Sequence, residues 1–167
     1  MARWGNVDYR QLQRLAKKME KLERAGFDKF CEDCAKELAA RLLAKVIKRT
    51  PVGNYENGHV GGTLRRGWTA KSEREAELSA AFGGGVGVNK YAESLNISRS
   101  GDVYEIEVIN PVSYSTYVEY GHRTANHKGW VKGQFMMTIS ADEVDAQAPQ
   151  IVEKKLTKFL GGVFGAD

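Results

Sequence analysis

Two stretches in the N-terminal third of the chain repeat apolar residues at helical spacing. The first extends from Asp8 to Arg24 and predicts a helix that Asp8 can cap. The second, from about Phe27 to Arg49, predicts a longer helix that ends at Thr50-Pro51, because proline disfavours helical backbone in the residue before it. The repeated apolar residues are Leu12, Leu15, Met19 and Leu22 in the first, and Phe27, Phe30, Cys31, Cys34, Leu38, Leu42 and Val46, with Leu43 and Ile47 beside them, in the second. A stripe as wide as the second is typical of a helix packed on a core.

The middle of the chain predicts loops and short strands. Residues 51–62 are rich in Gly and Asn and predict a loop, and the alternation in TLRRGWTA, residues 63–70, predicts a strand. Residues 71–93 join a charged stretch to a glycine-rich one, which we interpret as a long hairpin or an inserted loop. Residues 94–99 and 103–109 then predict a β-hairpin around SRSGD. One face of its second strand carries Tyr104, Ile106 and Val108, and the other carries Glu105 and Glu107.

A short helix is predicted after this hairpin. Residues 113–120 can form about two helical turns with Ser113 as a cap. Gly121 ends these turns, and a polar loop is expected to continue to Gly133.

A final helix is predicted from about Phe135 to Leu160. Ser140 and Glu143 match a capping box, and Pro149 must kink or restart the helix. The order of elements indicates an α+β fold, in which long N-terminal helices pack on a small antiparallel sheet, with a short helix and a C-terminal helix. We expect residues 1–26 to be a charged helical leader and residues 27–167 to be a single domain.

Composition places the chain among globular proteins with a mildly basic balance. Hydrophobic residues make up 42% and charged residues 28%, and the formal net charge is +4. This charge permits contact with nucleic acid or an acidic partner without requiring either. No apolar run approaches the roughly 20 residues that span a bilayer, and the N-terminus lacks a secretory signal, so we expect no membrane contact and synthesis in a cytoplasm.

The two cysteines, Cys31 and Cys34, form a C-x-x-C motif. A redox motif needs an exposed, electropositive helix start, whereas this pair lies within the apolar stripe of a helix, where free cysteine behaves as a small hydrophobe. We therefore favour core packing. The alternative is a zinc site completed by His122 and His127.

Two further segments could contact phosphate. The glycine-rich FGGGVGVNKY, residues 82–91, lacks the buried strand before it and the Gly-Lys-Ser or Gly-Lys-Thr after it that a phosphate-binding loop requires, so we interpret it as a flexible loop. The first helix is rich in basic residues, but Glu20 and Glu23 interleave with them, which fits a solvated face or an acidic partner equally well. Those basic residues are Arg10, Arg14, Lys17, Lys18, Lys21 and Arg24.

The densest group of chemically useful residues is YVEYGHRTANHKGW, residues 117–130. An enzyme would use Glu119 as a base with His122 or His127, but the segment has no nucleophile motif, second carboxylate or H-E-x-x-H spacing. Tyr, Trp and Arg are enriched at binding hot spots, so we favour an interaction surface. The candidate interaction residues are Arg65, Arg66, Trp68, Tyr117, Glu119, Tyr120, His122, Arg123 and Trp130.

Four blocks in this order carry a resemblance. They are RTPVG at 49–53, GGTLRRGW at 61–68, VYEIEVINPVSYSTYVEYGHRT at 103–124 and GQFMMTISADEV at 133–144. Together they resemble the neck (tail-completion, head–tail joining) protein family of long-tailed bacteriophages, over about Phe27 to Leu160. The matching positions, most of them expected to be structural, are Thr50, Pro51, Gly53, Leu64, Arg65, Trp68, Tyr117, Glu119, Tyr120, Gly121, Phe135 and Met136.

The resemblance implies a structural virion protein rather than an enzyme, with no catalytic, cofactor or metal residues. Such a protein is expected to form a homo-oligomeric ring, a hexamer, in the phage neck after assembly in the host bacterial cytoplasm. Its partners would be the head connector or head-completion protein and the tail terminator or tail tube protein. DNA would pass through the lumen without specific binding. Two alternatives remain: a DNA-binding module that uses the basic N-terminal helix, and a metal-dependent hydrolase built on Cys31, Cys34, His122 and His127.

Overall fold

The computed structural model describes residues 10–21, 26–56, 58, 60–101 and 103–164. Its helices are α1 (Arg10–Lys21), α2 (Phe27–Arg49), α3 (Thr63–Gly67), α4 (Glu73–Phe82), α5 (Val88–Ser94), α6 (Ser115–Tyr120) and α7 (Met136–Phe164). Its strands are β1 (Ile97–Ser100), β2 (Val103–Ile106), β3 (Gly121–Arg123) and β4 (Trp130–Lys132). The expected α+β fold is confirmed, with long helices at both ends of the sequence and small antiparallel sheets between them. Of the first expected helix, Asp8 and residues 22–24 lie outside the described residues.

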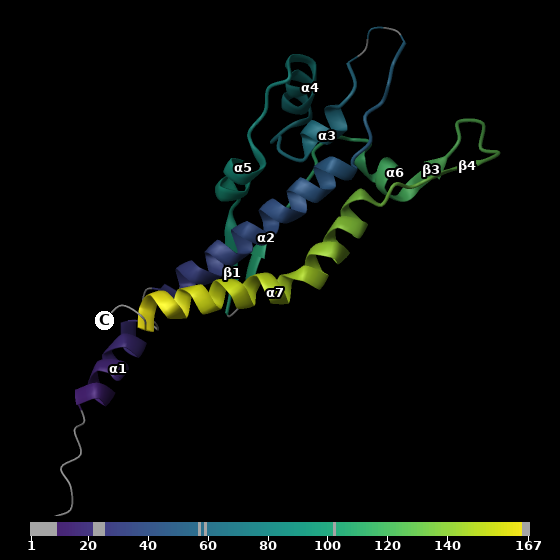
Figure 1. Cartoon of the computed structure of the whole chain (residues 1–167). Helices are drawn as coiled ribbons and strands as arrows, with labels where there is room; N and C mark the ends of the chain where they lie inside the picture. The colour runs from purple at the N-terminus through teal and green to yellow at the C-terminus, as the bar shows by residue number, and fades with distance from the viewer. Residues whose placement is uncertain (1–9, 22–25, 57, 59, 102, 165–167) are drawn as a thin grey trace, which may run out of the picture.

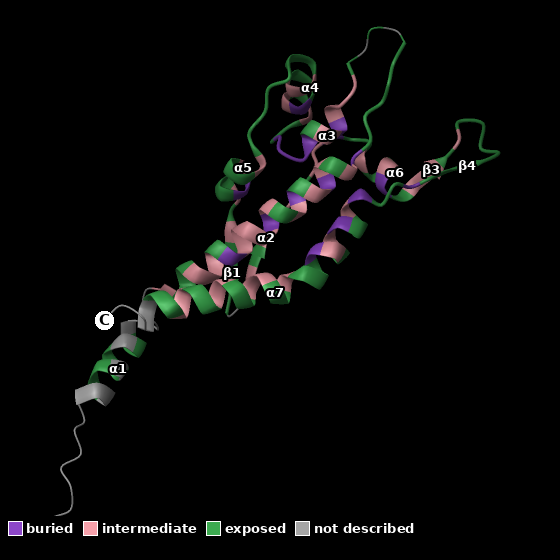
Figure 2. Cartoon of the chain, viewed as in Figure 1, coloured by how far each residue is buried: buried purple, intermediate pink, exposed green. Residues whose placement is uncertain are grey.

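Two long helices form the frame of the molecule. Figure 1 shows α2 and α7 side by side and antiparallel, with α3, α4 and α5 on the other side of α2, and the β1–β2 hairpin also contacts α2. The helix α7 continues through Pro149 and bends along its length, as the missing N–H of a proline inside a helix leads one to expect. Figure 2 shows that buried residues concentrate where α2 meets α3 and the start of α7.

The core lies around the C-terminal half of α2. Its buried residues are Leu43, Val46, Leu64, Trp68, Ala70, Ala76, Ala92, Val112 and Met136. These residues come from α2, from α3 and the turn after it, from α4 and α5, from the loop before α6 and from α7. The predicted stripe of α2 is therefore buried at Leu43 and Val46, whereas Phe27 at its start is half exposed.

The end of α2 is fastened to α3 through Thr50. The backbone N–H and the hydroxyl of Thr50 both donate to the Val46 carbonyl, at 2.9 and 2.6 Å. The same hydroxyl oxygen accepts the indole N–H of buried Trp68 at 2.7 Å, and the Thr50 carbonyl accepts two N–H groups of Arg65. This residue thus ends α2 where predicted and positions α3 against it.

Among the described residues, three ionic contacts join α2 to α7. Glu143 accepts from Lys45 at 2.8 Å and from Arg49 at 2.7 Å, and Arg49 also donates to the Ser140 hydroxyl. Toward the other end, Lys155 of α7 contacts Glu37 of α2 at 2.7 Å. Charged groups therefore join the long helices at two levels, near the C-terminal end of α2 and near its middle.

The capping box predicted at Ser140 and Glu143 is wrong. The helix α7 already begins at Met136, and the Ser140 hydroxyl donates to the Met136 carbonyl within it. A capping motif does occur at Ser72 and Glu75, where the Ser72 hydroxyl accepts the Glu75 N–H at 3.3 Å and begins α4. Residues 71–93 accordingly contain α4 and α5 rather than a hairpin or an inserted loop.

The strand predicted at 63–70 is also wrong. Gly62, at φ 107°, precedes a helical turn in which the Arg66 N–H donates to the Gly62 carbonyl. Leu64 and Trp68, both buried, are four residues apart, so the short apolar run follows the helical period rather than the strand period.

The remaining expected elements are confirmed with shifted boundaries. The hairpin around SRSGD is formed by β1 and β2, with Ile97 opposite Ile106, but residues 94–96 precede β1 and 107–109 follow β2. The short helix α6 ends before Gly121 as predicted, although Ser113 does not cap it and instead donates to Glu73. The expected polar loop between Gly121 and Gly133 contains the hairpin β3–β4.

We predict that Thr50→Val lowers the free energy of unfolding by about 1–3 kcal/mol, because it leaves the buried Trp68 N–H without its acceptor. Urea unfolding of the purified chain measures this. The matched control is Thr157→Val on the exposed part of α7, whose hydroxyl also donates to the carbonyl four residues earlier. That change should stay within about 0.5 kcal/mol, and equal losses for the two variants would contradict the role given to Thr50.

We also predict that acid weakens the α2–α7 pair. Lys155, and then Arg41, hold the pKa of Glu37 below its ordinary value of 4.5, and Lys45, and then Arg49, do the same for Glu143. A carboxyl whose pKa is lower in the folded state stabilises the fold above the unfolded pKa, and this contribution is lost as the pH falls through the folded value.

The measurement is the urea midpoint from about pH 7 to about pH 3. The double variant Glu37→Gln/Glu143→Gln should start with a lower midpoint than the native chain and lose less of it below pH 4.5. The exposed pair Glu105→Gln/Glu107→Gln serves as the control and should follow the native curve. A native-like acid response from the Glu37/Glu143 variant would refute the stabilising role given to these ion pairs.

Candidate interaction surface

Residues 117–130, the densest group of polar and aromatic residues, extend from α6 through β3 to the start of β4. Gly121 and Gly133 allow the backbone segments at the base of the β3–β4 hairpin to approach each other closely. Gly121 has φ 86°, and a side chain on it would collide with the Val131 carbonyl. A side chain on Gly133 would likewise meet the Glu119 carbonyl. The close approaches at Gly121 and Gly133 therefore keep the base of the β3–β4 hairpin next to α6. Figure 1 shows the hairpin projecting from the body of the molecule.

Glu119 serves as the N-terminal cap of α7. Its side chain is 6% exposed, and its carboxylate accepts the backbone N–H groups of Met137 at 3.0 Å and Thr138 at 2.9 Å, as well as the Thr138 hydroxyl at 2.8 Å. These N–H groups belong to the first turn of α7 and lack partners within the helix. The Glu119 carbonyl also accepts the Phe135 N–H. Glu119 is thus a structural residue that joins α6 to α7.

The tip of the hairpin is ordered by its own polar groups. The Thr124 N–H donates to the Gly129 carbonyl at 3.0 Å, and the His127 N–H donates to the Thr124 carbonyl at 2.8 Å. The side-chain oxygen of Asn126 accepts from the Thr124 hydroxyl and from the Lys128 N–H. His127 has φ 55°, a conformation that this turn requires of it. The side chains that the hairpin displays are accordingly presented from a fixed backbone.

Large apolar side chains are exposed at this end of the molecule. We name six exposed residues the aromatic surface: Tyr117, Tyr120, Trp130, Val131, Phe135 and Ile139. Trp130 and Val131 are consecutive on β4 and so project from its opposite faces. Trp130 is 63% exposed and lies opposite Arg123, which is also exposed, in the register of β3 and β4. Large apolar side chains are also exposed elsewhere, but here they lie on adjoining elements beside exposed basic residues, which makes this surface the candidate interaction site.

His122 lies at the base of this surface. It is partly buried, and its ring meets the ring of Tyr117 edge-on, with centroids 6.0 Å apart. Its Nδ1 atom is buried and has no hydrogen-bond partner among the described residues. The neighbouring base proposed for an enzyme, Glu119, instead points into the start of α7. These two side chains therefore do not combine into an acid–base pair.

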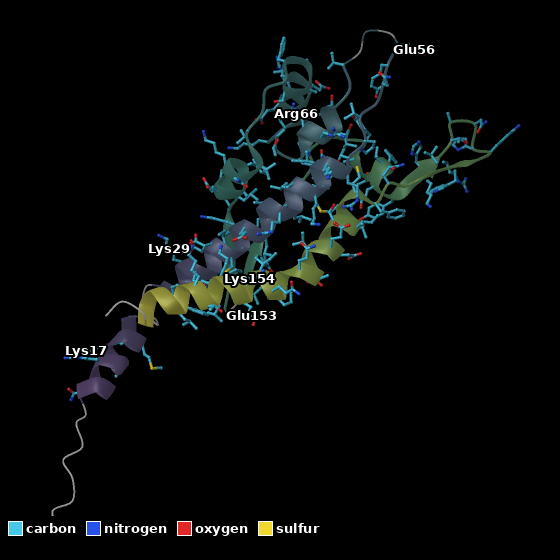
Figure 3. The ribbon with its side chains drawn as sticks, viewed as in Figure 1. Lys17, Lys29, Glu56, Arg66, Glu153 and Lys154 are labelled. Atoms are coloured by element: carbon cyan, nitrogen blue, oxygen red, sulfur yellow. The ribbon has the colours of Figure 1, made fainter. Side chains whose placement is uncertain are left out.

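The three interaction candidates on α3 and directly after it, Arg65, Arg66 and Trp68, differ in accessibility. Trp68 is buried in the core, and Arg65 directs its guanidinium at the Thr50 carbonyl. Arg66 is exposed and lies near α4 (Figure 3). Of the three, Arg66 has the side chain that a partner could reach.

The cysteines of the suggested zinc site lie on α2, whereas His122 lies on β3 and His127 lies at the hairpin tip. Cys34 is buried and Cys31 partly buried, and burial raises the pKa of both thiols. A raised pKa keeps a thiol protonated, which is the reverse of what a reactive or metal-binding cysteine requires. Within the described part of the chain, no group of three or more His, Cys, Asp and Glu side chains could hold a metal ion.

Sequence reasoning missed a second exposed apolar site on α4. Leu78 and Phe82 are 52% and 81% exposed. The Ser72–Glu75 spacing, which begins α4, could have revealed a helix that places these side chains one turn apart. The glycine-rich residues 83–87 connect α4 to α5. They follow a helix rather than a strand, so the context required of a phosphate-binding loop is absent at this described segment.

No helix among the described residues has both the length and the apolar character needed to cross a bilayer.

Comparison with known proteins gives one family. Residues 13–121 match the family model HK97-gp10_like, described as "Bacteriophage HK97-gp10, putative tail-component". The match begins within α1 and ends at Gly121, so it includes the blocks at 49–53 and 61–68 and most of the block at 103–124. No curated protein and no solved structure matched the chain.

We predict that Glu119→Ala lowers the free energy of unfolding by about 1–3 kcal/mol, because two backbone N–H groups of α7 lose their acceptor. Glu119→Gln keeps one acceptor oxygen and should cost less. Urea unfolding compares the two, with the exposed Glu107→Ala as a control expected to stay within about 0.5 kcal/mol. A Glu119→Ala variant as stable as the native chain would remove Glu119 from its capping role.

Proposed function

The chain belongs to the HK97-gp10-like family of bacteriophage tail components, and from that premise we propose that it is a structural protein of the phage neck. Identical subunits form a ring, a hexamer, that joins the head connector or head-completion protein to the tail terminator or tail tube. The protein acts by docking and carries out no chemical reaction. It works in the virion, after assembly in the host cytoplasm.

The observation that carries this proposal, beyond family membership, is the aromatic surface. Tyr117, Tyr120 and Trp130 are each about 60% exposed on a short helix and a hairpin whose backbone is held in place. Rigid aromatic side chains supply large contact areas at low entropic cost and dominate binding hot spots. A surface of this kind fits a permanent neighbour in an assembly better than it fits a freely soluble subunit.

Charge defines what this surface would meet. From Tyr120 to Ala141 the sequence contains no Asp or Glu, while Arg123, Lys128 and Lys132 are exposed on the hairpin. Such a surface favours an acidic face on the neighbouring ring. DNA crosses the lumen without specific binding in this proposal, because strong counterion-releasing contacts would retain DNA that must move.

A closed ring of subunits requires a contact that joins two different surfaces, one on each neighbouring subunit. A patch on one subunit that meets a different patch on the next generates a closed ring when the rotation between subunits closes. The exposed apolar groups of this chain lie in several separate places, among them the aromatic surface and α4. This arrangement is compatible with one site for neighbouring rings and another for neighbouring subunits.

We predict that the purified chain binds to tail tubes that lack it, as rings of one fixed copy number, and that Tyr117→Ala/Trp130→Ala weakens this binding at least about tenfold, because two aromatic anchors are lost. Electron microscopy of the tube ends and mass measurement of the complex give the copy number and the occupancy. Val103→Ala, which truncates an equally exposed side chain on the other sheet, is the control and should bind as the native chain does. Failure of the native chain to bind the tubes or the connector would refute the neck assignment.

A further inference from the structure

The exposed face of α4 is a narrow apolar stripe. Leu78, Ala81 and Phe82 are exposed at helical spacing, while Ala76 on the opposite face is fully buried in the core. The helix is held where it is, because Glu73 at its start accepts hydrogen bonds from both the N–H and the hydroxyl of Ser113. The stripe therefore faces away from its own chain.

A groove of about 780 Å³ lies between α2, α5 and the C-terminal half of α7. Its lining includes the apolar side chains of Phe30, Ala40, Ala92 and Phe159, and the rings of Phe30 and Phe159 stack with centroids 4.9 Å apart. Figure 3 shows Lys29 at this end of α2, beside the C-terminal part of α7. The groove thus has an apolar floor with charged side chains around it.

The charged side chains of the groove are biased toward lysine. Lys29, Lys36, Lys155 and Lys158 line it, against Asp33, Glu37 and Glu93. Glu37 and Lys155 pair with each other at 2.7 Å, which leaves Lys29, Lys36 and Lys158 against Asp33 and Glu93. An occupant that carries negative charge beside apolar groups is therefore favoured, and a basic one is disfavoured.

Charge separates α1, the β3–β4 hairpin and α4, three of the segments that combine exposed apolar and charged residues. The helix α1 contains five basic residues and one acidic residue, and the β3–β4 hairpin contains three basic residues and no acidic one. The helix α4 contains three glutamates, Glu73, Glu75 and Glu77, and one arginine, Arg74. Of these segments, α4 is the one whose charge complements the lysines of the groove.

The shape of α4 also fits. Side chains four residues apart on a helix lie on the same side, roughly 5–6 Å apart, so Leu78 and Phe82 can enter one groove together. Docking of an amphipathic helix into an apolar groove through such anchors is a common mode of protein recognition. In Figure 1 α4 lies at the opposite end of the molecule from the C-terminal part of α7, so the groove that receives α4 belongs to another copy.

We propose that α4 of one subunit docks through Leu78 and Phe82 into the α2–α5–α7 groove of the next subunit. This contact joins two different patches and so runs head to tail, which is the geometry that a closed ring requires. It rests on the ring proposed above and specifies which surfaces of neighbouring subunits meet. The aromatic surface is left free for the adjacent rings of the neck.

The test uses the full-length chain and two variants, each altered on one side of the contact. Phe82→Ser removes the most exposed anchor of α4 but leaves the groove intact. Lys29→Glu/Lys158→Glu reverses two exposed charges of the groove but leaves α4 intact. All these changes are at exposed positions, and circular dichroism confirms that each variant is folded. Val60→Ser, at an exposed loop position, is the matched control.

Sedimentation velocity and native mass spectrometry, over concentrations up to about 1 mM, measure self-association. We expect the native chain and Val60→Ser to associate, and each contact variant to associate at least about tenfold more weakly. A mixture of the two variants should form one-to-one dimers and nothing larger, because only one functional α4 and one functional groove remain per pair.

Three results would overturn this contact: a native chain that stays monomeric throughout, a Phe82→Ser variant that associates like the native chain, or a variant mixture that forms no dimer. None of them decides the neck assignment, which is tested separately by binding to tail tubes. Conversely, native-like self-association with no binding to tubes or connector would support the contact and refute the neck function.

Discussion

The hydrogen bonds around Thr50 are the constraint on which the rest of the fold depends. A helix that ends inside a protein leaves carbonyl groups that need partners, and α2 ends in the interior, where Thr50 is fully buried. Its hydroxyl both donates to Val46 and accepts from Trp68, so one side chain closes the helix and satisfies the buried indole. The position of α3, and with it the core that Leu64 and Trp68 complete, follows from this arrangement.

Polar contacts also place the aromatic surface at one end of the molecule. Charged side chains hold α7 along α2, and the buried carboxylate of Glu119 fixes the start of α7 against α6. The β3–β4 hairpin is then held by the close approach at Gly121 and Gly133. Glu119, which the sequence offered as a catalytic base, is thus a structural residue, because its carboxylate accepts hydrogen bonds from the backbone N–H groups at the start of α7.

What distinguishes this chain is the placement of its exposed apolar groups. Several of them lie on α4, α6 and β4, which are anchored in the core or joined to it by hydrogen bonds. Preorganised apolar groups of this kind favour association because little side-chain and backbone freedom is lost on binding. The groove between α2, α5 and α7 offers a complementary surface of different shape and charge. Membership in a family of phage tail components agrees with the proposal that other virion proteins cover several of these surfaces.

The sequence by itself determined the long helix α2 and its end at Arg49, the hairpin formed by β1 and β2, the stop of α6 at Gly121 and the general α+β class. These features depend on local signals: helical periodicity, a proline, alternation of side chains and glycine conformations. The tertiary structure alone decided between equivalent local signals. Ser72 and Ser140 both precede a glutamate by three residues, yet only Ser72 begins a helix, because Ser140 lies within α7, whose first turn is capped by Glu119 from another helix. Trp68 became core and Trp130 became surface for the same reason, since what covers a side chain is set by elements distant in sequence.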